Sequence, residues 1–98
     1  MPFDKRSDGR KLKQLCREAY RVLAQVLPDA LGAIGVTVVD VRPAPDGSRL
    51  AVGLAFEAGT EIPAAMARLA GLKGHLRSEL ASAIQRKRTP DLVFEVVA

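Results

Sequence analysis

Cations and glycines gather in one short stretch of this 98-residue sequence, where residues 71–74 read Gly-Leu-Lys-Gly. Arg68 precedes the stretch, His75 and Arg77 follow it, and the next acid is Glu79. Such a glycine pair weakens a helix and lets the backbone approach another molecule without a Cβ in the way. A helix that restarts at residue 74 or 75 would also offer free amide groups and the positive end of its dipole, which suit a phosphate. The stretch therefore predicts a contact with a nucleic-acid backbone.

We expect the RNA contacts to include this stretch and the cationic run that follows the helix: Arg68, Gly71, Leu72, Lys73, Gly74, His75, Arg77, Arg86, Lys87 and Arg88. A weaker second patch follows one face of the N-terminal helix: Arg10, Lys13, Arg17 and Arg21. Simpler interpretations stand beside these. Glycines can merely end a helix, and a basic helix face can simply be solvated. A lone surface histidine is often incidental, and cations after a helix can interact with its dipole.

The aromatic residues give no stacking platform, because the few present are dispersed and mostly fall in core patterns: Phe3, Tyr20, Phe56 and Phe94. Recognition is therefore expected to depend on RNA shape and phosphate, with little base specificity.

The charge of the chain is segregated along its length. Residues 1–27 carry seven Lys/Arg against three Asp/Glu, and residues 68–88 carry six against one, within a total net charge of +4. The positive charge thus belongs to the expected helices, and this favours a polyanionic partner on a helical face. The single Cys16 and single His75 leave no His/Cys metal site and no internal disulfide. Without a signal-peptide pattern or an apolar run of about 20 residues, we expect a cytosolic (cytoplasmic) protein and no membrane contact.

Residue periodicity predicts one α+β domain spanning residues 1–98, with residues 1–9 flexible and the element order α-β-β-α-α-β. A helix is expected from Arg10 to Leu27, ended by Pro28, and Thr60 is expected to cap the second helix. Strands are expected at 36–42, 49–57 and 91–97, and two short helices at the glycine break between about 62 and 88. All helices should cover one face of a three-stranded mixed sheet, giving an α/β sandwich. Because two helices are expected to reverse the chain between the second and third strands, the third strand should run parallel to the first and antiparallel to the second.

Several segments in this order resemble a known family. They are Leu31-Gly32, Val-Thr-Val-Val-Asp-Val at 36–41, Asp46, Ala-Val-Gly-Leu-Ala-Phe at 51–56, Gly-His-Leu-Arg-Ser-Glu-Leu at 74–80, Arg-Lys-Arg at 86–88 and Pro-Asp-Leu-Val-Phe at 90–94. Around a Gly-x-x-Gly helix-kink-helix, this pattern resembles the type II KH domain and, more closely, the ribosome-binding factor A family. The similarity covers roughly Lys11 to Glu95. Leu72 stands where the family usually has alanine, and the basic C-terminal tail common in the family is not present in this sequence.

The resemblance implies a non-enzymatic ribosome biogenesis factor, expected to act as a monomer without cofactor, metal or small-molecule substrate. Such proteins bind the small (30S) ribosomal subunit and its 16S rRNA near the decoding region during late maturation. They assist processing of the rRNA 5′ end and leave before translation. In the KH manner, the Gly-x-x-Gly segment and the following helix would hold the nucleotide backbone.

Other classes of function stay open at this point. The chain could be a general KH-type RNA-binding protein. It could also be a protein-docking module that uses the small-residue strand face or the edge of the last strand; such binding would lack the steep salt dependence of phosphate contacts. Catalysis is disfavoured, because no Ser, Cys or carboxylate occurs in a recognisable nucleophile setting.

Overall fold

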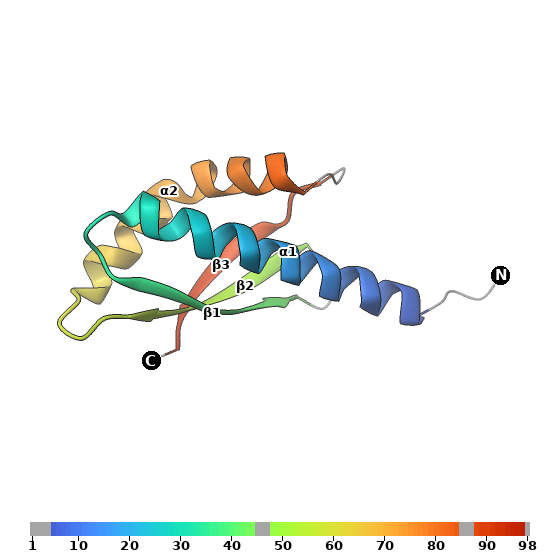
Figure 1. Cartoon of the computed structure of the whole chain (residues 1–98), viewed down its shortest axis with the longest axis horizontal. Coiled ribbons are helices and arrows are strands. Elements are labelled where there is room, and N and C mark those ends of the chain that lie inside the picture. Colours follow the sequence, from blue (N-terminus) through green and yellow to red (C-terminus); the bar gives the residue numbers. More distant parts are fainter. Residues whose placement is uncertain (1–4, 45–47, 85–87, 98) are drawn as a thin grey trace.

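The computed structural model describes residues 5–44, 48–84 and 88–97, with side chains described from residue 11 onward. Along the chain it contains, in the order α-β-β-α-β, the elements α1 (Lys5–Leu31), β1 (Val36–Pro43), β2 (Arg49–Phe56), α2 (Ile62–Ala83) and β3 (Asp91–Val96). In Figure 1 the two helices lie over the same side of the three strands. The α+β class predicted from the sequence is therefore confirmed.

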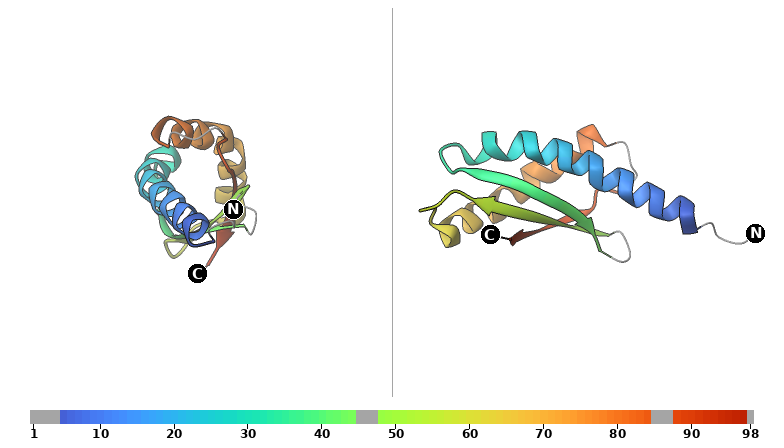
Figure 2. Two further views of the ribbon diagram at one scale, coloured as in Figure 1. Left: turned by 90° about the vertical axis from the view of Figure 1, so that its right-hand side faces the viewer. Right: turned by 60° about the horizontal axis from the view of Figure 1, so that its bottom comes forward.

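The sheet has the order β1-β2-β3, with β1 antiparallel and β3 parallel to β2. The mixed sheet was predicted correctly, but the direction of β3 relative to β2 was not. A single helix, α2, connects β2 to β3, so the chain returns to the starting edge and the next strand runs the same way. Figure 2 shows this arrangement from two further sides, with β2 in the middle of the sheet.

Aliphatic side chains from every element form one core between the helices and the sheet. The largest fully buried ones come from both helices and two of the strands: Leu23, Leu27, Leu31, Leu50, Leu54, Leu69, Leu76, Leu80, Leu92 and Val52. Strand β2 contributes Leu50, Val52 and Leu54, which alternate as expected for one face of a strand. No polar or charged side chain is buried in the part of the chain that the structure describes. Burial of apolar surface is therefore the main stabilising contribution in this core.

Helix α1 is longer than predicted at both ends. It begins at Lys5 and continues through Pro28 to Leu31. The helix then ends at Gly32, whose φ of 63° is left-handed and whose N–H donates to the Pro28 carbonyl at 3.0 Å. Glycine tolerates this conformation without a Cβ penalty, so Gly32 terminates the helix and the proline only precedes the end.

A β-bulge in β1 decides which of its side chains face the core. Val38 pairs with Leu54 and Asp40 pairs with Gly53, so Val39 is the extra residue. Simple alternation from Val38 would direct Asp40 inward, and the bulge shifts the phase by one residue. The charged side chain consequently lies on the helix-free face of the sheet, and Val39 is 48% exposed.

The helix-free face is less open at its centre than the small residues of β2 suggested. A Cβ placed on Gly53 would collide with Oδ1 of Asp40 and would lie 3.2 Å from Val97. Arg42 lies 3.6 Å from the Asp40 carboxylate and also pairs with Glu95 of β3. The side chains of neighbouring strands therefore cover the glycine, and a charged row crosses this face.

Helix α2 is one continuous element, where two short helices were predicted. Residues 62–83 are helical throughout, and neither Gly71 nor Gly74 has a positive φ. Figure 1 nevertheless shows that α2 changes direction between its yellow and its orange half. Glycine costs about 1 kcal/mol relative to alanine inside a helix, which is too little to break one anchored by buried leucines on both sides. The glycines thus occur in a bent helix and not in a loop.

The start of α2 also differs from the prediction in one residue. Glu61, not Thr60, occupies the N-cap position, and it makes no side-chain capping hydrogen bond. The backbone N–H of Thr60 instead donates to the Glu57 carbonyl at 3.1 Å, closing the turn before the helix. Pro63 lies in the first helical turn, as predicted, where its missing N–H is harmless.

Candidate nucleic-acid interface

The middle of α2 presents an open, small-residue surface. A Cβ placed on Gly71 or on Gly74 would meet no atom within 4 Å, and Ala70 and Ser78 beside them are exposed. Positions three or four apart share a helix face, so these four residues form one strip on the solvent-facing side of α2, called the glycine strip below. Another molecule can therefore approach the α2 backbone closely here.

This strip does not offer a free helix N-terminus. The amides of Gly74 and His75 lie inside a continuous helix, so the predicted restart with unpaired N–H groups is wrong. Two features of this surface still favour phosphate binding. The glycines let a phosphate come close to the α2 backbone, and the neighbouring side chains carry positive charge.

Lys73 and Arg77 lie one helical turn apart on the flank of α2 nearest to β3, where Lys73 contacts the first residue of that strand and Arg77 contacts the segment before it. The Lys73 Nζ lies 3.3 Å from Oδ1 of Asp91 and 3.5 Å from Oδ2. Arg77 Nη2 donates to the Thr89 carbonyl at 3.0 Å. Both side chains keep solvent access, with 38% of the Lys73 side chain exposed. The two cations are thus held on one side of the glycine strip and remain accessible.

The contact with Lys73 changes the acidity of Asp91. The Lys73 hydrogen bond, together with a backbone hydrogen bond from Leu92, lowers the pKa of the Asp91 carboxyl. Because the folded pKa is depressed, the carboxylate stabilises the fold above its unfolded pKa of about 4, and this contribution is lost as the pH falls through the lower folded value.

Replacing Asp91 by asparagine should therefore lower the free energy of unfolding at about pH 7 and have progressively less effect below about pH 4. The contact is solvent-exposed, so the effect should be small. Urea unfolding of wild type and Asp91→Asn across a pH series measures the difference. A deficit that stays constant from neutral to acidic pH would mean that the charge of Asp91 contributes nothing.

Arg68 and His75 belong to the opposite flank of α2. His75 Nε2 lies 4.0 Å from Oε1 of Glu79, and its side chain is 57% exposed. Arg68 lines a hollow of about 440 Å³ together with two acids, Glu57 and Glu61. The acids make this hollow a poor phosphate site. Arg68 is separated from the two cations near β3 by its position on the opposite flank of α2.

The remaining residues of the predicted set divide into three groups. Leu72 is partly buried and packs against the hydrophobic core, so much of its side chain faces away from the surface of α2. Arg88 is exposed beyond the end of α2. Arg86 and Lys87 lie outside the described residues, and so does the side chain of Arg10.

The basic stripe of α1 lies on the helix surface as predicted. Lys13, Arg17 and Arg21 are exposed and recur every four residues. Tyr20 stands among them with 41% of its surface exposed, although the sequence pattern had suggested core positions for most aromatics. The periodicity alone could have shown this, because Tyr20 is three residues from Arg17 and therefore shares its side of the helix.

Among the described residues, no group of three or more His, Cys, Asp or Glu side chains could hold a metal ion. No described helix is long and apolar enough to cross a membrane. A layer of two helices on a mixed three-stranded sheet defines a small α+β protein. This arrangement agrees with the KH-like fold that the sequence resemblance implies.

Comparison with known proteins narrows this class. No family model and no curated protein matches the sequence. The crystal structure of ribosome-binding factor A from Thermus thermophilus superposes with a TM-score of 0.72 and 29% identity, over 87% of this chain and 94% of that one. A homology model of Thermus thermophilus ribosome-binding factor A, fitted into a cryo-EM map of its complex with the 30S subunit, gives a TM-score of 0.63 and 29% identity over 86% and 88%.

A candidate ribosome-binding factor A from Thermotoga maritima, solved by NMR, agrees in fold, with a TM-score of 0.62 and 18% identity over 89% of this chain and 83% of that one. The resemblance of this chain to the ribosome-binding factor A family is therefore confirmed by its fold.

Proposed function

We propose that this protein is a non-catalytic ribosome biogenesis factor that binds the small (30S) ribosomal subunit and its 16S rRNA during late maturation and assists processing of the rRNA 5′ end. The observation that carries the proposal is the match, over most of both chains, to a ribosome-binding factor A fitted into a 30S complex. The glycine strip of α2 and its cationic flank support the same interpretation.

In this proposal the phosphate backbone of the rRNA lies across α2 at Gly71 and Gly74. Their missing side chains allow close approach, and Lys73 and Arg77 neutralise phosphates on the side facing β3. Asp91 and the Thr89 carbonyl hold the two cations in place before RNA arrives, which reduces the side-chain entropy lost on binding. In this contact the sheet supports α2 from the core side.

Sedimentation of the protein with purified small subunits over a series of salt concentrations tests the proposal. We expect co-sedimentation at low salt, and a binding constant that falls steeply as salt rises, because each neutralised phosphate releases counterions. Purified large subunits serve as the control and should not retain the protein at the same ionic strength.

Two outcomes would count against the proposal. Failure to bind small subunits at low salt would remove the function directly. Binding with little salt dependence would instead favour a protein-docking role for the helix-free face of the sheet, where apolar and paired charged side chains predominate.

A further inference from the structure

A groove of about 520 Å³ lies between α1 and the end of β1, away from the glycine strip of α2. Both elements contribute its apolar lining, which consists of Leu12, Cys16, Val41 and Pro43. Two cations, Lys13 and Arg17, border the groove. Leu12 and Val41 are half-buried, so they expose apolar surface into the groove. An apolar floor with a basic border suits a ligand that is both planar and anionic.

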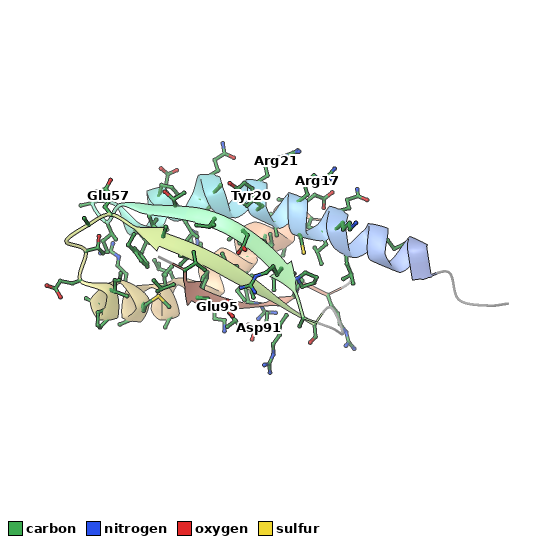
Figure 3. The ribbon with its side chains drawn as sticks, turned by 90° about the horizontal axis from the view of Figure 1, so that it is seen from below. Arg17, Tyr20, Arg21, Glu57, Asp91 and Glu95 are labelled. Atoms are coloured by element: carbon green, nitrogen blue, oxygen red, sulfur yellow. The ribbon has the colours of Figure 1, made fainter. Side chains whose placement is uncertain are left out.

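An exposed aromatic ring lies on α1 one helical turn beyond the groove. Tyr20 is four residues from Cys16, and Arg21 is four residues from Arg17, so both pairs follow the same flank one turn further on. Figure 3 shows Arg17, Tyr20 and Arg21 in succession along α1, with Tyr20 on the side nearer the sheet. The groove, the ring and the cations therefore lie along the same flank of α1.

The cations of this surface have no acidic partner among the described residues. No ion pair there involves Lys13, Arg17 or Arg21, while Glu18 accepts a hydrogen bond from Gln14 on the neighbouring flank at 3.4 Å. Three unpaired positive charges at successive helical turns attract a ligand with regularly spaced negative charges. The positive charge of this surface thus favours a polyanionic ligand.

We propose that this flank of α1 is a second RNA-binding surface that takes a single-stranded segment. One base stacks on Tyr20, a neighbouring base enters the groove above Cys16, and Arg17 and Arg21 contact the intervening phosphates. The inference rests on the proposed function as an rRNA-binding factor and adds to it a site separate from α2, with a preference for unpaired nucleotides.

A single strand fits this surface better than a duplex does. A duplex keeps its bases stacked inside and presents phosphate and sugar, so the ring of Tyr20 and the apolar groove would have no partner. Single strands present free base faces, and their stacking on aromatic side chains is tolerant of sequence.

An added peptide strand fits less well than RNA. The edge of β1 carries the bulge at Val39 and ends at Pro43, which has no N–H to donate, so a peptide could not pair regularly with this edge.

Fluorescence anisotropy with a labelled single-stranded oligouridylate and a duplex RNA of equal length tests the proposal. We expect Tyr20→Leu to weaken oligouridylate binding roughly 5- to 150-fold, as loss of one stacked base predicts. Tyr20→Phe keeps the ring and should bind like the wild type, and duplex binding should change little in either variant. Equal affinity of wild type and Tyr20→Leu for the oligouridylate would overturn the proposal.

The cations have a matched control on the same helix. Arg17→Glu should weaken oligouridylate binding and reduce its salt dependence, whereas Lys11→Glu makes the same charge change on the opposite flank of α1 and should have a much smaller effect. Equal losses in the two variants would mean that only net charge matters, which contradicts a defined site. Thermal unfolding of each variant confirms that the exposed substitutions leave the fold intact.

Cys16 allows a direct test of the groove because it is the only cysteine in the chain. It is 9% exposed, so its alkylation should be slow but measurable. Saturating oligouridylate should slow the reaction further, and the duplex should not. An unchanged rate under saturation would show that no base enters the groove.

Co-sedimentation with small subunits separates this inference from the proposed function. If wild type and Tyr20→Leu both bind small subunits and bind oligouridylate equally, the α1 site is wrong and the ribosomal role stands. If wild type binds oligouridylate through Tyr20 but does not bind small subunits, the ribosomal role is wrong and the α1 site stands.

Discussion

Replacing Lys73 and Arg77 together by glutamate is expected to weaken binding to purified small subunits by roughly 30- to 150-fold at low salt. This range corresponds to about 1 to 1.5 kcal/mol for each lost charge-assisted contact, a low value chosen because both side chains are solvent-accessible. The slope of log affinity against log salt should also decrease by about 2, because two phosphates are no longer neutralised. Co-sedimentation across a salt series measures both quantities.

The design of this variant must allow for the internal contacts of the two cations. A glutamate at position 73 would face the Asp91 carboxylate that now lies 3.3 Å from the lysine nitrogen. Lys73→Gln with Arg77→Gln removes the charges without this repulsion and should lose affinity in the same direction. Lys11→Glu with Arg49→Glu changes exposed charges elsewhere by the same amount and serves as the control. A folded glutamine pair with wild-type affinity and slope would exclude this flank of α2 from the interface.

Much of the fold follows from local sequence patterns. The alternation of Leu50, Val52 and Leu54 identified the buried face of β2, and the β-branched run identified β1. These segments were predicted correctly because burial of one face imposes a period of two on a strand. The charge segregation likewise assigned the cations to the helices, where the structure exposes them.

Two features were predicted wrongly from the sequence: the break in α2 and the direction of β3. Both depend on how the helix packs in the whole fold. Leu69, Leu72, Leu76 and Leu80 continue one helical spacing across both glycines, and Leu72 packs against the core. The glycines drew attention to a break, whereas packing on both sides keeps the helix intact. The direction of β3 followed from the same error, since one connecting helix makes the strand parallel to β2.

The internal partners of the site cations could not be derived from the sequence alone. Lys73 and Asp91 are 18 residues apart, and only the return of the chain through α2 brings them together. Asp91 and the Thr89 carbonyl therefore limit how freely Lys73 and Arg77 can move, which the pattern of charges did not reveal. The glycines, by contrast, were recognised correctly as positions without a side chain, and their open surroundings are a result of the structure.

Changing both Gly71 and Gly74 to alanine is expected to raise stability and weaken small-subunit binding at the same time. Each position has ordinary helical backbone angles and open space for a methyl group. Alanine should therefore stabilise α2 by about 0.4 to 1 kcal/mol at each site, and raise Tm by several degrees. The added methyl groups would hold an RNA backbone away from the helix, so affinity should fall roughly tenfold, equivalent to about 1.4 kcal/mol.

The opposite signs of these effects are what make the glycine variant informative. A purely structural role for the glycines predicts no loss of binding, and a required sharp bend predicts a loss of stability. Ser82→Ala raises helix propensity at an exposed position one turn beyond Ser78, away from both glycines, and should leave binding unchanged. Thermal unfolding and co-sedimentation of the two variants give both readouts. If the double alanine variant is more stable and binds small subunits as tightly as the wild type, the RNA backbone does not lie on this strip.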